Sequence, residues 1–179
     1  TLIEDLLSYS SLHDIKGRKL VNTDLNLIVE DVKTQLSEVI KEKNASMHTG
    51  RLCAVNIIPY QFKQVLLNLI SNALKFSKSG TSPIISIESQ VVKFNKIKHM
   101  GLPQHKEYCH IKVKDNGIGI DESKFDSIFS KYYRLENDIE GSGIGLYLVK
   151  EIVNNAGGKI LVKSQLGEGT EFQVYLKAE

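Results

Sequence analysis

A glycine-rich segment late in the chain, residues 141–146 (GSGIGL), excludes one large group of folds. Alternate glycines before a helix suit an anion, because the free N–H groups and the helix dipole point toward it. In parallel dinucleotide-binding folds, such glycines directly follow a buried strand within a βαβ unit. No strand immediately precedes residue 141, so we do not expect a doubly wound parallel sheet.

The rest of the hydrophobic pattern predicts helices packed on a largely antiparallel sheet. Apolar residues recur at helical spacing in several segments, and elsewhere they alternate with polar residues as in half-buried strands. We expect an α+β fold, a two-layer sandwich whose mixed, mostly antiparallel sheet carries helices on one face. Expected helices cover 1–12, 24–40, 59–76, 123–129 and 144–155. Expected strands lie at 20–23, 45–48, 51–57, 85–87, 111–113, 159–164 and 170–176, with a long hairpin excursion at 93–106.

Composition excludes several classes of protein. Hydrophobic residues make up 41% and charged residues 25%, a balance typical of a globular domain. Apolar runs are far shorter than the roughly 20 residues that span a bilayer, and no signal segment opens the chain. A net charge of +2 lacks the basic excess of a dedicated nucleic-acid binder. Cys53 and Cys109 are too few for a disulfide framework, so we expect a reducing cytoplasm.

Three polar residues share one face of the helix expected from Pro59. Asn68, Asn72 and Lys75 are four and seven positions apart, so they lie close together beside the apolar stripe. Amide oxygens suit Mg²⁺, and a lysine suits phosphate. The alternative is a solvated helix edge, although asparagine is a poor residue within a helix.

A second glycine-bearing segment, Asp115-Asn116-Gly117-Ile118-Gly119-Ile120, directly follows an expected strand. Its glycines let the backbone approach a flat ligand, and its carboxylate can accept a hydrogen bond from an exocyclic amine. Taken alone, the segment could equally form an ordinary turn.

The order of these segments resembles the N, G1, F and G2 boxes of sensor histidine kinases. The boxes correspond to Asn68–Asn72, Asp115–Gly119, Ile128–Arg134 and Gly141–Gly145, and the resemblance covers about residues 20–179. The wider group is the Bergerat-fold, or GHKL, ATPases, which includes gyrase-type topoisomerases, mismatch-repair ATPases and heat-shock chaperones. The resemblance implies a transferase that acts in two-component signal transduction, with ATP and Mg²⁺ as cofactors.

The resemblance implies roles at the phosphate end of such a site. Asn72 would ligate Mg²⁺, and Asn68 would be a second ligand or would position water near the γ-phosphate. Lys75 and Arg134 would contact phosphate. Together with Asn68, they are the expected catalytic residues. Three glycines would cradle the phosphates and hinge a short ATP lid, namely Gly141, Gly143 and Gly145.

At the base end, the resemblance implies that Asp115 accepts from the adenine amine. Phe76 would lie against adenine or ribose, and Thr170 would support Asp115 through a water. Gly117 and Gly119 would allow the close approach of the ligand. Four further residues of the boxes would line the nucleotide site, namely Ile120, Tyr133, Ser142 and Leu146.

The phosphoacceptor is not expected within this chain. In the family it is a histidine on a dimerisation helix, followed by an acid and then a proline, whereas His13-Asp14 lacks the proline. Residues 1–18 resemble the end of a dimerisation helix with its linker, and residues 19–179 resemble the catalytic, ATP-binding domain. The resemblance implies two partners, namely the protein's own dimerisation and phosphoacceptor helices and a response-regulator receiver domain. It also implies that the parent is a homodimeric phosphoprotein that is cytoplasmic or anchored in a membrane. The fragment itself is expected to contact neither nucleic acid nor membrane.

Three alternatives remain at this point. One is a degenerate, regulatory nucleotide-binding module, which intact boxes oppose. Another is a gyrase-like ATPase, which Asn68 opposes because hydrolysing relatives carry a glutamate there and asparagine cannot act as a general base. The last is a zinc site formed by His99, His105, Cys109 and His110, which strand alternation opposes because adjacent residues point to opposite faces.

Overall fold

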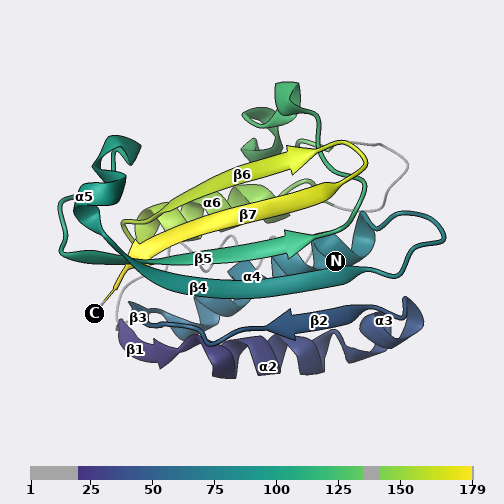
Figure 1. The fold of residues 1–179 in the computed structure, drawn as a ribbon, viewed down its shortest axis with the longest axis horizontal. Helices are drawn as coiled ribbons and strands as arrows, with labels where there is room; N and C mark the ends of the chain where they lie inside the picture. Colours follow the sequence, from purple (N-terminus) through teal and green to yellow (C-terminus); the bar gives the residue numbers. More distant parts are fainter. Residues whose placement is uncertain (1–19, 135–141, 179) are drawn as a thin grey trace.

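The computed structural model describes residues 20–134 and 142–178, and a five-stranded sheet forms its centre (Figure 1). The strand order is β2-β4-β5-β7-β6. β2 pairs with β4 in parallel, and the other three pairings are antiparallel. The bounds are β2 (Ser46–Thr49), β4 (Ile84–Lys93), β5 (Glu107–Asp115), β6 (Lys159–Gln165) and β7 (Gly169–Lys177). A separate antiparallel pair joins β1 (Val21–Asp24) to β3 (Ala54–Ile57).

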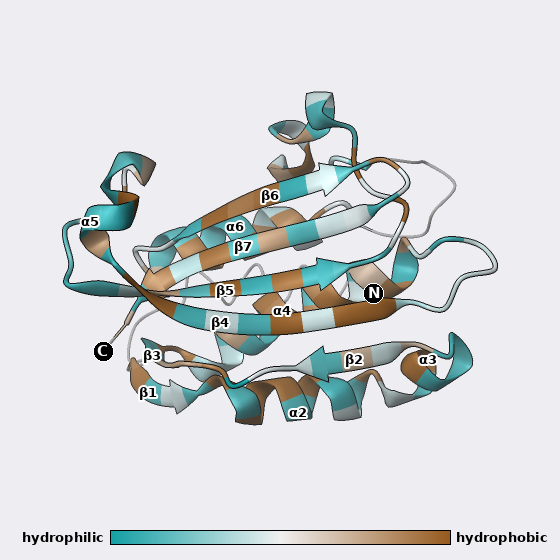
Figure 2. Ribbon diagram, in the orientation of Figure 1, coloured by the Kyte–Doolittle hydropathy of each residue, from teal (hydrophilic) through white to brown (hydrophobic). Residues whose placement is uncertain are grey.

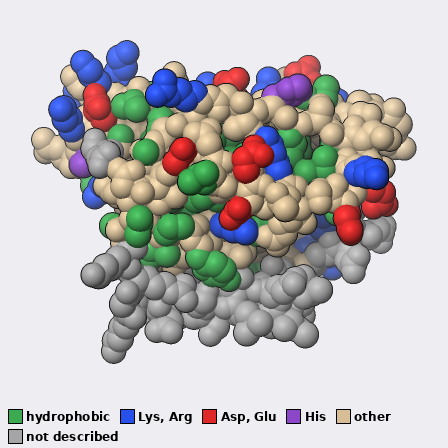
Figure 3. Space-filling model, turned by 90° about the horizontal axis from the view of Figure 1, so that it is seen from below, with side chains coloured by type: hydrophobic (Ala, Val, Ile, Leu, Met, Phe, Trp, Pro, Cys, Tyr) green, Lys and Arg blue, Asp and Glu red, His purple; other side chains and the backbone are tan. Residues whose placement is uncertain are grey.

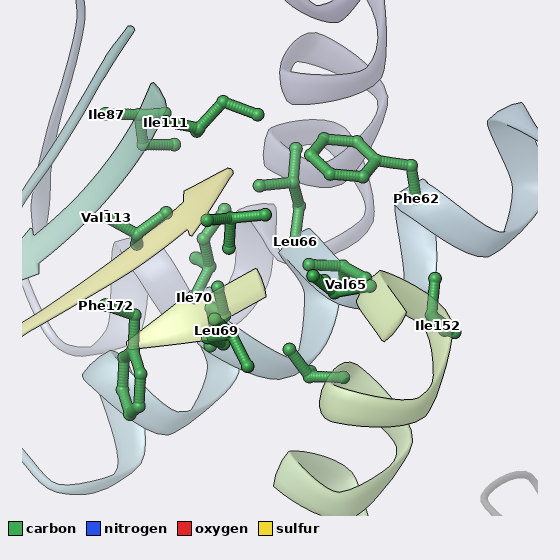
Figure 4. Close-up of a cluster of buried hydrophobic side chains, with 14 of the residues drawn as sticks. Phe62, Val65, Leu66, Leu69, Ile70, Ile87, Ile111, Val113, Ile152 and Phe172 are labelled. Atoms are coloured by element: carbon green, nitrogen blue, oxygen red, sulfur yellow. The ribbon is translucent and has the colours of Figure 1, made fainter. Parts of the chain in front are cut away.

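Three helices pack behind one face of this sheet, as expected for the α+β sandwich (Figure 1). They are α2 (Leu25–Gln35), α4 (Pro59–Lys75) and α6 (Gly145–Asn155). Proline at the first position of α4 loses nothing, since its N–H would be unpaired there. Every apolar residue predicted for the stripe of α4 is buried. Figure 4 shows the labelled part of this core: Phe62, Val65, Leu66, Leu69, Ile70, Ile87, Ile111, Val113, Ile152 and Phe172.

The strands have an inner and an outer face that differ in chemistry. Hydrophobic and hydrophilic residues alternate along β4 and β5 (Figure 2), because successive side chains point to opposite faces. The inner face of β5 carries Cys109, Ile111 and Val113, which join the main core. On the surface viewed from below, acidic and basic side chains are interspersed (Figure 3), in keeping with the small net charge. No helix within the described ranges is long and apolar enough to cross a membrane.

Two predicted helices are wrong in detail. The helix expected over 24–40 breaks at Leu36, between α2 and α3 (Ser37–Glu42). Leu36 and Ile40 still pack against the main core but are only partly buried, and no residue of α3 is fully buried. Asp24 does cap α2, accepting from the Asn26 N–H. The helix expected over 123–129 is two 3₁₀ turns, η2 (Glu122–Lys124) and η3 (Ser127–Phe129). The adjacent residues Ile128 and Phe129 of η3 are both buried, which suits a tight turn better than an α-helix with a single buried stripe.

The hairpin excursion forms a small hydrophobic cluster of its own on the outer face of the sheet. It contains α5 (Phe94–Ile97) and η1 (Lys98–Met100). Its buried members Ile97 and Leu102 pack with Tyr108 of β5 and Tyr175 of β7. The excursion therefore covers an apolar patch of the sheet. The helix expected at 1–12, the linker after it and His13 lie outside the described residues.

Candidate nucleotide-binding site

Most residues expected at the base end of the site meet in one pocket. The pocket lies between the last turns of α4, the end of β5, the start of β7 and the first turn of α6. Its lining residues are Asn72, Ala73, Phe76, Asp115, Ile118, Gly119, Ile120, Leu146, Thr170 and Phe172. The lining is mostly apolar with a few polar groups, as in small-molecule sites generally.

Asp115, the last residue of β5, is held by two backbone amides. Its Oδ1 accepts from the N–H of Gly117 at 2.8 Å and from the N–H of Thr170 at 3.2 Å. Burial raises the pKa of the Asp115 carboxyl above its ordinary value, while these two amides and nearby Lys78 oppose the rise. Both bonds use Oδ1, so they orient the carboxylate without engaging Oδ2. Thr170 thus supports Asp115 through its backbone N–H, and the further support expected through a water stays a prediction.

The glycines of this segment allow protein backbone, as well as any ligand, to come close. A Cβ on Gly117 would lie 2.6 Å from the carbonyl oxygen of Phe76, which accepts from the Ile118 N–H at 3.0 Å. Gly119 has φ +76°, and a Cβ there would lie 2.0 Å from the carbonyl oxygen of Gln165. Side chains at either position would push the segment away from its neighbours.

The two asparagines of α4 lie in different surroundings. Asn68 donates from Nδ2 to the carbonyl of Gln64 at 2.9 Å, and its Oδ1 faces Gly145 so closely that a Cβ there would lie 2.5 Å away. Gly145 thus lets the first turn of α6 rest on α4. Asn72 lies one turn further along α4 and lines the pocket. Lys75 follows it, with Nζ 5.0 Å from the ring centroid of Phe76, a cation–π geometry.

The segment before the lid contacts the glycines after it through the backbone. The N–H of Tyr132 donates to the carbonyl of Gly143 at 2.9 Å. Tyr132 has φ +66°, which is unusual for a residue other than glycine. Gly143 has φ +70°, and a Cβ there would lie 2.8 Å from the Tyr132 carbonyl carbon. Phe129 anchors this segment, meeting the pocket residue Phe172 edge-on at 6.3 Å between ring centroids.

Other predicted site residues do not line this pocket. Tyr133 packs against the main core, and Arg134 is exposed. Ser142 accepts through Oγ from the Ile144 N–H at 3.2 Å, supporting the turn into α6. Gly141 lies outside the described residues, as do the acidic lid positions Glu136, Asp138 and Glu140.

Ser164 is a bracing residue that sequence reasoning missed. Its Oγ accepts from the Ile120 N–H at 2.8 Å, donates to the Gly169 carbonyl at 2.7 Å and lies 2.9 Å from the Thr170 hydroxyl. Alternation offered a signal, since Ser164 falls on the same face of β6 as Ile160 and Val162. A polar residue in such a row is expected to have a partner.

The histidine and cysteine grouping does not converge on a metal. Cys109 joins the main core, whereas His110 points to the outer face and stacks on Tyr175 at 4.2 Å between ring centroids. Burial lowers the pKa of His110, with nearby Lys112 acting in the same direction. Within residues 20–134 and 142–178, no group of three or more His, Cys, Asp or Glu could hold a metal ion.

Solved structures of similar fold include ShkA and the histidine kinase ThkA. The chain aligns with full-length ShkA, crystallised with AMPPNP, at a TM-score of 0.76 and 22% identity, covering 98% of this chain and 35% of that one. It aligns with the nucleotide-free catalytic domain of ThkA at 0.69 and 23% identity, covering 89% and 95%. At such identities these similarities establish the fold.

Sequence comparison extends to curated proteins and to a family model. The chain is 34% identical over 174 residues to phytochrome-like protein Cph1 of Synechocystis sp., covering 96% of the chain and 21% of that protein. It is 30% identical over 190 residues to autoinducer 2 sensor kinase/phosphatase LuxQ of Vibrio vulnificus, covering 99% and 21%. The chain thus spans about a fifth of these relatives' length. Residues 58–179 match the model described as histidine kinase-, DNA gyrase B-, and HSP90-like ATPase, and the chain belongs to that family.

Proposed function

We propose that this chain binds ATP with Mg²⁺ and donates the γ-phosphoryl group to a histidine on a dimerisation segment. The observation that carries the proposal is the single pocket shared by Asp115, Phe76 and Asn72, each a different kind of nucleotide contact. Family membership and the sensor kinases among the relatives support it. The proposed catalytic and ATP-binding domain is 19–179, and residues 1–18 are the proposed end of a dimerisation helix and its linker.

The base end of the pocket suits adenine. The Asp115 carboxylate, fixed by two amides through Oδ1, leaves Oδ2 to accept from an exocyclic amine. Guanine presents a carbonyl oxygen at that position, and a buried carboxylate opposite it would lack a donor. Phe76, Ile120 and Leu146 supply apolar surface for the ring, and Gly119 leaves room for it.

The phosphate end suits a magnesium triphosphate. The Asn72 side chain is half-buried on the pocket wall, and its amide oxygen is a hard ligand of the kind Mg²⁺ accepts. Bound Mg²⁺ neutralises phosphate charge. Lys75 and Arg134 would add positive charge around the transferring group, and Asn68 would assist at the γ-phosphate. The glycines at 143 and 145, with Gly141, would form the phosphate cradle, and the first amides of α6 would add donors.

Transfer to histidine fits this site better than hydrolysis. Asn68 cannot take a proton from water, so no general base stands where hydrolysing relatives carry one. The nucleophile must come within about 3–3.5 Å in line with the leaving oxygen, and we assign it to the dimerisation helices of a homodimeric parent. A response-regulator receiver domain would then accept the phosphoryl group.

The test is labelling with radioactive ATP. The chain alone should bind Mg·ATP but show no stable phosphorylation and only slow hydrolysis. Adding the parent's complete dimerisation hairpin in trans should produce acid-labile label on the hairpin histidine. An Arg134→Ala variant should bind the nucleotide yet transfer poorly. Strong labelling of the chain alone, lost in His13→Ala, would contradict the proposal, and so would failure to bind ATP, which would favour a degenerate regulatory module.

A further inference from the structure

Two cysteines that are far apart in the sequence meet inside the domain, away from the nucleotide pocket. Cys53 lies just before β3, and Cys109 is in the first half of β5. The Cys53 thiol contributes to raising the pKa of the Cys109 thiol, so the two side chains are neighbours. The proposed nucleotide chemistry uses neither side chain.

Ser89 of β4 holds this pair in place. The Cys53 N–H donates to Ser89 Oγ at 2.7 Å, and the Ser89 hydroxyl donates to Cys53 Sγ at 3.1 Å. The same hydroxyl is also within reach of the Cys109 thiol. These bonds connect the loop before β3 to the centre of the sheet, so the meeting of the two thiols is a built feature.

Strand register explains why the second thiol lies there. Ser89 pairs with Ile111, and Val91 pairs with Cys109, so Ser89 and Cys109 are diagonal neighbours on the inner face. Ser89 is the polar member of a row that also contains Ile85 and Ile87. The sheet thus fixes Ser89 beside Cys109, and the backbone bond from Cys53 brings the other thiol to both.

The two thiols differ in access. Cys109 is fully buried, with 0% exposure, whereas Cys53 is only half-buried and lies between the buried Leu52 and the exposed Ala54. Burial raises the pKa of the Cys109 thiol well above its usual range, so Cys109 stays protonated in the reduced protein. Because Cys53 is the more accessible of the two, it is the residue that an oxidant reaches first.

We propose that Cys53 and Cys109 are an oxidative modification site that forms a reversible disulfide within the domain. A hydroperoxide oxidises the Cys53 thiol to a sulfenic acid and is itself reduced to the alcohol, or to water when the oxidant is hydrogen peroxide. The Cys109 sulfur then attacks the sulfenic sulfur, the S–S bond forms, and the hydroxyl leaves as water with the Cys109 proton. An external dithiol restores both thiols and becomes a disulfide itself.

Closing this bond would constrain the unfolded chain across the long loop between the two residues. A native disulfide of this kind raises the thermal midpoint of a domain of this size by roughly 5–10 °C. The expected result of oxidation is therefore a stabilised domain whose thiols are protected from further oxidation.

The test treats the purified chain with hydrogen peroxide, blocks remaining thiols under denaturing conditions and maps peptides by mass spectrometry. The expected product is a monomer about 2 Da lighter, with a Cys53–Cys109 cross-linked peptide that a dithiol removes. This mapping uses the unaltered protein, so it does not depend on any variant folding. A Ser89→Ala variant should form the bond severalfold more slowly, while Ser86→Ala, on the outer face of the same strand, should match the parent rate.

Two further variants identify the order of the steps. Cys109→Ala should accumulate a sulfenic acid at Cys53, detected by dimedone, because the resolving thiol is gone. Cys53→Ser should leave Cys109 unoxidised, because the buried thiol is not reached. Free thiols at both positions after oxidation, dimers linked through Cys53, or oxidation of Cys109 in Cys53→Ser would each overturn the proposal.

Discussion

The two glycine-bearing walls of the proposed nucleotide site are built in different ways. The base wall, residues 115–120 with 164–170, is held by several directed hydrogen bonds from strand ends, including those to Asp115 and Ser164. Among the described residues, the phosphate wall, Tyr132 with 143–145, is held by the Tyr132–Gly143 backbone bond, the bond from the Ile144 N–H to Ser142 and close packing at its glycines. The base wall is thus preorganised by the sheet, whereas the phosphate wall rests on loop contacts. Changes in the base wall are therefore expected to be the more costly.

The largest effect is expected at Gly119. Gly119→Ala combines a positive φ with a clash against the Gln165 carbonyl, so it should lower the free energy of unfolding by about 3 kcal/mol or more. Gly167→Ala is a matched control in the same region, because its φ of +80° is similar but no atom lies within 4 Å. The control should lose about 1 kcal/mol. Urea denaturation measures both, and equal losses would contradict the role assigned to close packing.

The next effect concerns base recognition by Asp115. Asp115→Ala should weaken ATP binding about 10- to 100-fold, the cost of an unmet buried hydrogen bond. The parent chain should prefer ATP to GTP by at least about tenfold, and the variant should lose most of that preference. Calorimetry measures these affinities. Asn116→Ala is the control, because Asn116 binds the backbone of Ser82 and Ile84 and does not line the pocket; equal parent affinities for ATP and GTP would refute the assignment.

A comparable test at the phosphate end is Asn72→Ala. The variant should keep its fold, because Asn72 lies beside the buried stripe of α4. It should lose roughly tenfold in Mg²⁺-dependent ATP affinity, the value of a single ligand or hydrogen bond. Ser71→Ala is the adjacent control, since that hydroxyl bonds to the Asn68 carbonyl within the helix. Unchanged affinity in Asn72→Ala would end the assignment of Asn72 as the metal ligand.

The base wall also predicts a pH dependence of stability. Burial raises the pKa of Asp115 above 3.8, so its contribution to stability is fully present below that pH and is lost as pH rises through the folded-state pKa. The free energy of unfolding of the parent chain, relative to Asp115→Asn, should fall over this range and then level off. Asp121 is the opposing control, because a bond from the Ser123 side chain lowers its pKa. Relative to Asp121→Asn, the parent should instead lose stability as pH falls; denaturation at several pH values checks both signs.

The sequence predicts those structural features that depend on neighbouring residues better than those that depend on contacts between distant segments. The stripe of α4 and the alternation of β4 and β5 are set by periodicity, and the structure confirms both. The break at Leu36 and the 3₁₀ turns at 122–129 are local departures from a regular α-helix, which periodicity alone does not reveal. The outer cluster under α5 is harder to predict, because its partner Tyr175 lies far along the chain from the excursion.

The candidate site shows the same difference between features set by local sequence and features set by distant contacts. Motif order grouped Asn72, Phe76, Asp115, Gly119 and Thr170, and the structure places all five in the lining of one pocket, while their roles stay predictions. The bracing by Ser164 and the direct amide bond from Thr170 depend on the register of β6 and β7, which hairpin length sets only approximately. The close contact of Gly117 with Phe76 joins two distant segments, so the sequence indicated a glycine role there but attributed it to the ligand alone.

The smallest predicted effect tests the strain in the phosphate wall. Tyr132 has a positive φ and an exposed side chain, so the conformation costs energy that little packing repays. Asparagine tolerates this conformation better, because its short side chain bonds locally to the backbone. Tyr132→Asn should therefore raise the free energy of unfolding by about 0.5 kcal/mol. Tyr132→Ala removes the same ring, including its contact with Lys131, but keeps the strain. Tyr132→Ala should therefore give no gain in the free energy of unfolding. Equal stability of the two variants would show that the backbone of this wall is unstrained.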